Sequence, residues 1–588
     1  MYSNLKSVQM LIALLKKYGV KHVVMSPGGS DIPIIHSIEN DSDFVCYSVV
    51  DERSAVYFGM GVAQETNSPV ACVCTSGTAV SNYLPGMTEA SFQNVPIVAI
   101  TADKNPRYLG QLEIQKTNQI NIFGDVCRKA VNLPIIQSTE DELYCERLIA
   151  ETLVELTHKG TGPVHINIPI VENNAIYDVD TLPAVKDIQI IPAYATEDEW
   201  VRIQKELANF KRIMIVVGQN VHYSKELIKN IEMFYKHYNC MISVESLSNL
   251  DCNGTIHTYP ITEMKKGNLT QNLVPDLVIS IGNNIVSYGL KPFLRKHRKE
   301  FKHWAVDNEG RIRDVFNSLT KVFECPEFIF FSKMNKLAQE ATRNDGLYYN
   351  IWKRLYDKIV IPEFDFSNFY VAQQLSKVIP ENSILHTAIL NSTRVMQFFE
   401  LAKGVKSYSN IGALGIDGCM STFMGQAACT SELAFLLIGD LSFFYDMNSA
   451  GIKHVGNNVR VILLNNGGGS EFHFMMGRKK IPTINEHICA EHHKIAEGWV
   501  TSLGYEYYSA SSKEELDAIL PKFAEKSDAP MFIEVMTDME EEAERTRKFY
   551  VMNDNDTVQS GLKNAAKAIL SDSQIDTLKK VKGKLFGR

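Results

Sequence analysis

The stretch LLIGDLSFFYDMNSAGIKHVGNNVRVILLNNGGG, residues 436–469, holds two apolar strands with a helix-length segment between them. The first strand ends in Gly439-Asp440, and the second ends in Asn465-Asn466 before three glycines. Strands connected in this way are parallel, so their carboxyl ends lie at the same edge of a sheet. Loops with helix caps would explain the polar residues. A magnesium ion that holds a diphosphate is the sharper interpretation, because Mg²⁺ binds oxygen ligands together with phosphate oxygens.

A magnesium ion at this edge would take ligands from three residues. Asp440 would supply a carboxylate, Asn466 a side-chain carbonyl, and Gly468 a main-chain carbonyl, since glycine lets the chain approach closely. Open α/β sheets bind ligands at the carboxyl ends of their strands, where helix N-termini offer free N–H groups to phosphate. The spacing of Asp440 and Asn466 therefore predicts a metal–diphosphate site.

Alternating strands and helices extend over most of the 588 residues, which are too many for one hydrophobic core. Apolar strands that end in glycine-rich or polar turns, each followed by a helical segment, predict parallel sheets covered by helices on both faces. Residues 171–198 and 361–368 carry proline and polar residues and are predicted linkers. We expect an α/β protein of three doubly wound parallel-sheet domains, at residues 1–180, 195–345 and 365–545, with a tail at 546–588.

Composition excludes several classes of protein. The net charge of −8 and the absence of a long basic face before the tail argue against a general nucleic-acid binder. Eleven scattered cysteines are typical of a reduced compartment, and no apolar run is long enough to span a bilayer. The first twenty residues form an amphipathic pattern without a signal-peptide cleavage site. We expect a cytoplasmic protein whose Lys-rich tail is solvated or contacts another subunit, with an anionic partner or membrane surface as the alternative.

The opening stretch resembles the thiamin-diphosphate motif of the 2-oxo acid decarboxylase and carboligase superfamily. Within it the chain is similar to the SEPHCHC synthases of the menaquinone pathway, which join 2-oxoglutarate to isochorismate. The resemblance covers about residues 5–540 and is weak in the middle. It is carried by the runs SPGG, DERSAVYFGMG, CTSGTAVSNYLPGMTEAS, VPIVAITAD, SNIGALGIDGCMST and IGDLSFFYDMN.

This resemblance implies an enzyme with thiamin diphosphate and Mg²⁺ as cofactors. Its domains would be a pyrimidine-binding domain, a central domain and a diphosphate-binding domain, in that order. It also implies a homodimer or homotetramer, because the cofactor lies between the first domain of one subunit and the third domain of another.

The resemblance further suggests which residues act on the substrate. Glu52 matches the glutamate that hydrogen-bonds the pyrimidine ring and shares a proton with a ring nitrogen. The alternative is that Asp51 and Glu52 only cap a helix. Gln115 aligns with a glutamine on the substrate side of the cofactor. His473 is the available proton donor, although a histidine there is as often structural.

Other positions are expected to bind the cofactor. Ile416 matches the bulky apolar residue that supports the bent cofactor, and Ser442 lies beside Asp440 near the diphosphate. His487, His492 and His493 resemble a zinc site only superficially, and we expect no metal there. The remaining residues expected to line the cofactor site are Ser26, Pro27, Gly28, Thr75, Ser76, Gly77, Asp417, Ser421 and Leu441.

The chain departs from the SEPHCHC synthases at positions where they use basic residues to bind carboxylates. Arginine binds a carboxylate bidentately, so its loss changes the substrate. Asp31, in the first of these positions, is expected to repel an anionic substrate. The residues at the expected basic positions are Gly29 with Ser30 and Asp31, Lys104, Tyr288-Gly289 with Lys291 offset, Met396 with Arg394 nearby, and Ile411.

The sequence therefore predicts a carboligase that decarboxylates a 2-oxo acid and transfers the acyl unit to an acceptor, with a substrate different from that of the SEPHCHC synthases. A decarboxylase that releases an aldehyde is the first alternative. SEPHCHC synthase itself is disfavoured by the lost arginines, and a non-enzymatic binding protein by the intact Glu52, Asp440 and Asn466.

Overall fold

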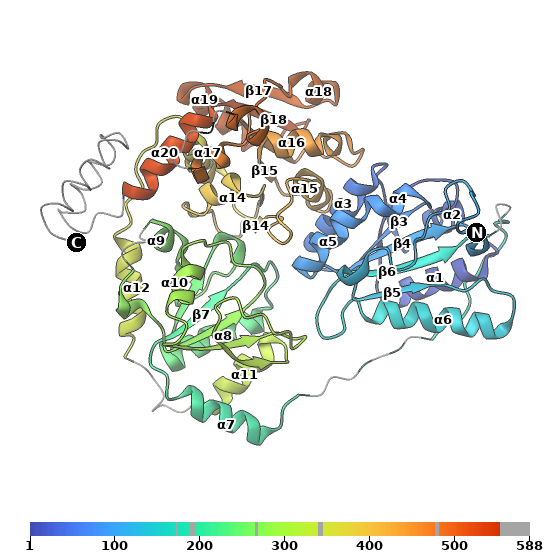
Figure 1. The fold of residues 1–588 in the computed structure, drawn as a ribbon, viewed down its shortest axis with the longest axis horizontal. Coiled ribbons are helices and arrows are strands. Elements are labelled where there is room, and N and C mark those ends of the chain that lie inside the picture. Colours follow the sequence, from blue (N-terminus) through green and yellow to red (C-terminus); the bar gives the residue numbers. More distant parts are fainter. Residues whose placement is uncertain are drawn as a thin grey trace, which may run out of the picture.

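The computed structural model describes residues 1–171, 175–186, 188, 190, 194–264, 269–338, 345–476, 481 and 483–552. Within them the chain forms three six-stranded sheets, and each named strand pairs in parallel with its neighbours. Figure 1 shows these sheets in three bodies, the first at the right, the central one below and the third at the top. The prediction of three parallel-sheet α/β domains is confirmed, while their limits remain predictions.

The first sheet has the strand order β2-β1-β3-β4-β6-β5. All five residues of β3 are buried, because helices cover both faces of a parallel sheet. The strands are β1 (His22–Ser26), β2 (Val45–Ser48), β3 (Val70–Cys74), β4 (Ile97–Asp103), β5 (Lys129–Asn132) and β6 (Val164–Pro169). The helices are α1 (Lys6–Lys17), α2 (Ile32–Glu39), α3 (Glu52–Thr66), α4 (Thr78–Asn82), α5 (Leu84–Gln93) and α6 (Thr139–Val154).

The central sheet has the order β12-β11-β10-β7-β8-β9, so its first strand pairs with its fourth at a topological switch point. Its strands are β7 (Ile213–Val217), β8 (Met241–Val244), β9 (Thr255–His257), β10 (Leu277–Ile281), β11 (Lys302–Val306) and β12 (Leu319–Phe323). Its helices are α7 (Glu197–Leu207), α8 (Lys225–Tyr238), α9 (Tyr259–Met264), α10 (Leu290–Lys296), α11 (Glu327–Leu337) and α12 (Leu347–Asp357).

The third sheet repeats the strand order of the first, as β14-β13-β15-β16-β18-β17. Its strands are β13 (Ile384–Thr387), β14 (Lys406–Tyr408), β15 (Ala434–Gly439), β16 (Val459–Asn465), β17 (Glu506–Ala510) and β18 (Met531–Met536). Its helices are α13 (Asn368–Val378), α14 (Asn391–Met396), α15 (Cys419–Ala427), α16 (Asp440–Asp446), α17 (Ser470–Met476), α18 (Glu497–Ser502), α19 (Lys513–Phe523) and α20 (Met539–Met552). Helix α20 enters the predicted tail, whose remainder lies outside the described residues.

The first and third domains share one hydrophobic cluster, which α3 and α15 join (Figure 1). The two helices cross with reciprocal glycines: Gly61 faces the Thr422 carbonyl, and Gly425 faces the Phe58 carbonyl. A Cβ atom at either glycine would overlap that main-chain oxygen. Glycine at both positions therefore lets the two backbones touch, which fixes how the two domains meet.

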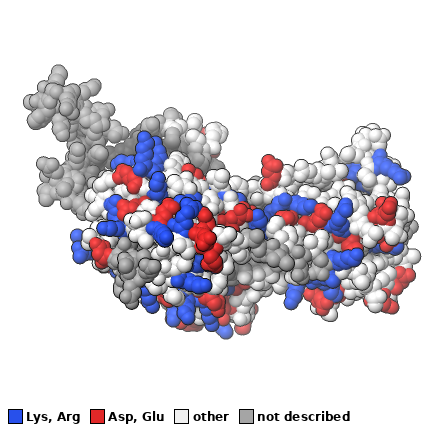
Figure 2. All heavy atoms as spheres, turned by 90° about the horizontal axis from the view of Figure 1, so that it is seen from below, with Lys and Arg blue, Asp and Glu red and all other residues white. Residues whose placement is uncertain are grey.

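Among the described residues, no helix is long and apolar enough to cross a membrane. On the face shown in Figure 2, basic and acidic side chains are interspersed. The cytoplasmic location and the absence of nucleic-acid binding remain predictions.

Candidate active site

Asp440 lies at the carboxyl end of β15 and anchors the loop that follows β16. Its Oδ2 accepts the main-chain N–H groups of Asn466, Gly467 and Gly468 at 2.8–3.0 Å, and its Oδ1 accepts that of Leu441 at 2.6 Å. The side chain is nearly buried, so these four donors replace water around its charge. The structure thus brings together the residues that the sequence assigns to a magnesium ion.

The chemistry of this loop fits a hard divalent cation bound to a diphosphate. Carboxylate, amide and main-chain oxygens come from Asp440, Asn466 and Gly468, and Mg²⁺ favours oxygen ligands. Gly467 has a φ of +82°, and a Cβ atom on Gly468 would lie 2.8 Å from the Cys489 carbonyl oxygen. Glycine is therefore required at both positions for the loop to keep this shape.

His492 also approaches this loop, which the sequence did not reveal. Its Nε2 lies 3.5 Å from Asp440 Oδ2, and its ring packs edge-on against Phe444 at 5.2 Å. The side chain is 7% exposed, whereas that of His487 is 71% exposed. His492 thus belongs beside the predicted metal ligand rather than to a histidine cluster with His487 and His493.

Ser442 of α16 and Ile416 of the loop before α15 are in contact. The Ser442 hydroxyl donates to the Ile416 carbonyl at 2.6 Å, and this bond ties α16 to the loop before α15. Ile416 is 38% exposed. The loop of residues 466–468, which Asp440 anchors, is called the Asp440 loop below. An exposed apolar side chain beside it is consistent with the predicted role of Ile416 in supporting the cofactor.

Asp417 and Ser421 point elsewhere. Asp417 Oδ2 accepts the Tyr57 hydroxyl of α3 at 3.1 Å. Ser421 is fully buried, and its hydroxyl and its main-chain N–H both donate to Asp446 at 2.8 Å. Neither residue contacts the Asp440 loop, so their cofactor roles stay predictions that these contacts do not support.

The contacts at the N-terminus of α3 show which of its acidic residues, Asp51 or Glu52, caps the helix. Asp51 is the helix cap, because its Oδ1 accepts the N–H groups of Arg53 at 3.0 Å and Ser54 at 3.4 Å. Glu52 makes no hydrogen bond or ion pair with any residue that the structure describes. Capping therefore needs only Asp51, and the Glu52 carboxylate remains available.

Two loops of the first domain lie side by side near Glu52. A Cβ atom on Gly28 would overlap the side chain of Thr75, so the loop after β1 rests directly on the loop after β3. Gln115 Nε2 donates to the Ser76 carbonyl at 2.9 Å, and Gly77 has a φ of +86° with no room for a side chain beside Gln115. The structure therefore brings Gln115 to the predicted pyrimidine-binding loops.

Ser26, Pro27 and Asp31 complete the first of these loops. The buried Ser26 hydroxyl donates to the Val49 carbonyl at 2.8 Å, while Pro27 is exposed. Asp31 Oδ1 accepts the Gly28 N–H at 2.8 Å, and the Asp31 side chain is fully buried. Asp31 thus stabilises the turn, and its repulsion of an anionic substrate remains a prediction.

Burial makes Asp31 a source of pH-dependent stability. Desolvation raises its pKa to about 6, against an unfolded value of 3.8, and the charge of Glu52 adds to this. The folded state therefore holds the proton more tightly, and stability falls as pH rises through about 6. We expect Asp31→Asn to raise the free energy of unfolding at pH 8 by about 3 kcal/mol. Thermal unfolding should show this gain shrinking at pH 5, and an equal gain at both pH values would contradict it.

His473 lies in α17, directly after the metal loop. Its Nε2 is 2.7 Å from Asn485 Oδ1, and its main-chain carbonyl accepts a hydrogen bond from Arg547. On the same helix, Glu471 forms an ion pair with Arg394 of α14. The role of His473 as a proton donor remains a prediction.

A pocket of about 180 Å³ lies beside this ion pair, where the central domain meets the third. It is bounded by the loop after β10, by α14 and by the loop after β14. Two of its leucines, Leu390 and Leu414, have φ values of 62° and 61°, and such strain in bulky residues is concentrated at functional sites. The lining residues are Asn284, Ile285, Val286, Tyr288, Lys291, Leu390, Thr393, Arg394, Ile411, Gly412 and Leu414.

Several of the positions where the SEPHCHC synthases are expected to have basic residues line this pocket, and one of these assignments needs correction. Met396 is buried in the core of the third domain, whereas Arg394 lines the pocket, so an arginine is present here after all. Ile411 and Tyr288 line the same pocket as predicted replacements. Lys104 lies elsewhere and donates to the Ile114 carbonyl at 2.5 Å.

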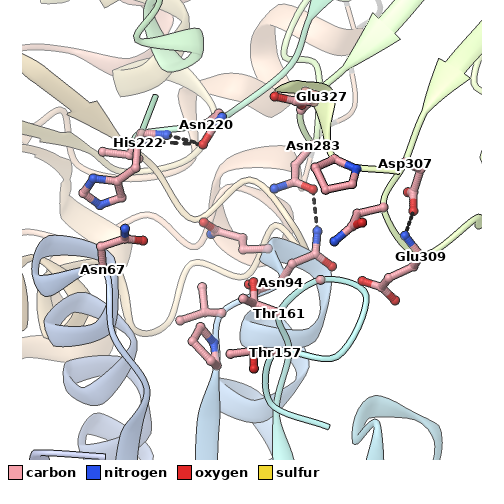
Figure 3. Close-up of a pocket in the computed structure, with 18 of the residues that line it drawn as sticks. Asn67, Asn94, Thr157, Thr161, Asn220, His222, Asn283, Asp307, Glu309 and Glu327 are labelled. Atoms are coloured by element: carbon pink, nitrogen blue, oxygen red, sulfur yellow. Dashed lines mark hydrogen bonds between the residues drawn. The ribbon is translucent and has the colours of Figure 1, made fainter. Parts of the chain in front are cut away.

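A larger pocket of about 570 Å³ lies between the first and central domains (Figure 3). Figure 3 shows Asn94 hydrogen-bonded to Asn283 across it, and Arg311 Nη1 also donates to Asn94 at 2.9 Å. Arg311 forms ion pairs with Asp307 and Glu309. These charges are therefore paired with one another, and the contacts connect the two domains.

Comparison with known proteins identifies the family. Residues 5–122 match the family described as "Thiamine pyrophosphate enzyme, N-terminal TPP binding domain". A 2-succinyl-5-enolpyruvyl-6-hydroxy-3-cyclohexene-1-carboxylate synthase (SEPHCHC synthase) from Phocaeicola vulgatus is 37% identical over 560 residues, 94% of this chain and 99% of the relative. Synthases of the same name from Bacteroides thetaiotaomicron and Bacteroides fragilis are 36% and 34% identical, again over 94% of this chain and 99% of theirs. The chain therefore belongs to the SEPHCHC synthase family of thiamin-diphosphate-dependent enzymes.

Proposed function

We propose that this enzyme decarboxylates a 2-oxo acid and transfers the remaining acyl unit to an acceptor, with a donor or acceptor other than 2-oxoglutarate and isochorismate. The observation that carries this proposal is the combination of an ordered Asp440 loop with a pocket in which Arg394, the arginine among its described lining residues, is paired with Glu471. A decarboxylase that releases an aldehyde is the second candidate, favoured if His473 donates a proton.

The residues of the Asp440 loop would hold the cofactors. Asp440, Asn466 and Gly468 would bind Mg²⁺, and His492 would lie beside the Asp440 carboxylate. Thiamin diphosphate, when bound, supplies the carbon nucleophile and electron sink that 2-oxo acid decarboxylation requires. Glu52 would hold a proton at a pyrimidine ring nitrogen, and Ile416 would support the cofactor.

The enzyme is proposed to be a homodimer or homotetramer. Within one chain, Arg53, which follows Glu52, donates to the Tyr445 carbonyl near the end of α16. Asp440 is the first residue of that helix, so Glu52 and Asp440 lie toward opposite ends of α16. Apolar side chains near the predicted site are also strongly exposed, including Leu112 at 98% and Ile114 at 82%. A second subunit that covers these side chains and brings its own Glu52 to the Asp440 loop accounts for both features.

A panel of 2-oxo acids, with and without acceptor aldehydes and isochorismate, tests the proposed reaction. We expect carbon dioxide release that requires thiamin diphosphate and Mg²⁺, together with a ligated product when the right acceptor is present. Free aldehyde formed at the same rate with and without acceptor would support the decarboxylase instead. Efficient turnover of 2-oxoglutarate with isochorismate would overturn the proposed change of substrate.

A further inference from the structure

The loop that carries Tyr288 into the 180 Å³ pocket is held rigidly from behind. Glu245 accepts the N–H groups of Val286 and Ser287, each at 2.7 Å, and Glu263 accepts that of Gly289 at 2.5 Å. Both carboxylates are buried. The pocket wall is therefore fixed in position, as specific recognition of a small substrate group requires.

Arg394, the arginine among the described residues of this pocket, has its charge paired with a carboxylate and its guanidinium covered by an aromatic ring. Its guanidinium forms an ion pair with Glu471, and the Tyr288 ring stacks over it at 4.6 Å. The side chains of Arg394 and Glu471 are only 15% and 9% exposed, so water screens their attraction weakly. An arginine held in this way has little capacity left to bind a substrate carboxylate.

The remaining charges also disfavour an anionic group. Lys291 donates to the Ile285 carbonyl at 2.8 Å and lies 5.7 Å from the Tyr288 ring. The charges of Glu245 and Glu263 act on Lys291 from behind. Among the described residues that line the pocket, the two cations Arg394 and Lys291 already have partners, Glu471 and the Ile285 carbonyl, so an added negative charge would gain little from them.

Size alone does not decide the occupant. A dry cavity of about 150 Å³ holds benzene, so a pocket of about 180 Å³ accepts roughly six non-hydrogen atoms. The five-atom side chain of 2-oxoglutarate is small enough, and only its charge is unsuitable. Val286, Leu390, Ile411 and Leu414 make apolar walls, and Asn284 and Thr393 add uncharged polar groups that suit a hydroxylated side chain.

We propose that this pocket receives the side chain of the donor 2-oxo acid. This side chain is an uncharged aliphatic or hydroxylated group of about six non-hydrogen atoms or fewer. Glu471 excludes dicarboxylic donors, because its ion pair with Arg394 occupies the charge that would bind the second carboxylate. This inference rests on the proposed function and adds the class of its donor. Glu471 and Tyr288 are specificity-determining residues in this proposal.

Carbon dioxide release from 2-oxobutyrate, 2-oxoisovalerate and 2-oxoglutarate tests the donor class. In the unmodified enzyme, kcat/KM for the better neutral acid should exceed that for 2-oxoglutarate at least about tenfold. Glu471→Gln frees the Arg394 charge and should shift this ratio toward 2-oxoglutarate by about tenfold or more. Glu541→Gln is the matched control, because it breaks a surface ion pair with Arg545 in the same domain and should leave the ratio unchanged.

A second variant, Tyr288→Ala, and a binding measurement test the donor assignment independently of Glu471→Gln. Tyr288 is 41% exposed, so Tyr288→Ala should fold even if Glu471→Gln does not, and it should improve kcat/KM for neutral acids with longer side chains. Titration calorimetry of the same acids into the Glu52→Gln variant, loaded with thiamin diphosphate and Mg²⁺, reports binding with little turnover, because this variant is expected to keep the cofactor and lose most of its activity. Binding that prefers neutral acids but gives no carbon dioxide would overturn the proposed function alone. A preference for 2-oxoglutarate, or a ratio unmoved by both variants, would overturn the donor assignment.

Discussion

Replacing Asp440 with alanine is expected to abolish cofactor binding and catalysis together. The carboxylate accepts four main-chain N–H groups, three of them from the 466–468 loop, and its removal leaves these donors unpaired in a buried place. The same change removes the predicted charged ligand of Mg²⁺. We expect no turnover above background, whereas mutation of an outer-shell partner of a metal ligand costs only about 10- to 100-fold.

The direct readout for Asp440→Ala is thermal unfolding with and without thiamin diphosphate and Mg²⁺. A ligand at one hundred times its Kd stabilises the native state by about 2.7 kcal/mol, so the unmodified enzyme should show a clear rise in Tm. Asp440→Ala should show none. Asp538→Ala is the control, because Asp538 also caps main-chain N–H groups after a strand of this sheet but lies on the surface. Unchanged cofactor affinity in Asp440→Ala would refute the site.

Glu52→Gln is expected to remove most of the activity while leaving the cofactor bound. The glutamine keeps the shape of the side chain but cannot hold or release a proton at a pyrimidine nitrogen. General acid–base catalysis contributes about 10²- to 10⁴-fold, so turnover should fall by an amount in this range. The Kd for thiamin diphosphate, measured by calorimetry, should change only a few-fold, since no contact in the described structure depends on the Glu52 carboxylate.

The neighbouring carboxylate provides a matched control for Glu52. Asp51 caps α3, and asparagine caps helices equally well, so Asp51→Asn should retain both stability and activity. Full activity in Glu52→Gln would remove its assigned role. Equal losses in both variants would point to a disturbed helix instead of a missing proton carrier.

The sequence predicted the parts of this structure that depend on local pattern. Apolar strands that alternate with helices predicted three parallel sheets, and the polar ends of β15 and β16 predicted that Asp440 would meet the 466–468 loop. Both predictions rest on a general property of parallel sheets, in which strand ends gather at one edge.

The parts that the sequence missed depend on contacts between distant segments. His492 reaches Asp440 from an irregular loop, which has no periodicity to reveal its direction. The stack of Tyr288 on Arg394 joins two domains, so neither local pattern contains it. Asp31 was expected to repel an anionic substrate, and its position after Ser30 does not show that the turn closes over its side chain and buries it.

The crossing of α3 and α15 has a consequence for the history of the chain. Two domains with one strand order, joined by equivalent helices through reciprocal glycines, have the arrangement of two subunits related by a twofold axis. Fusion of duplicated genes would explain such internal symmetry. In the proposed site the two copies have different tasks, since Glu52, the proposed proton carrier, comes from the first domain and Asp440, the proposed metal ligand, from the third.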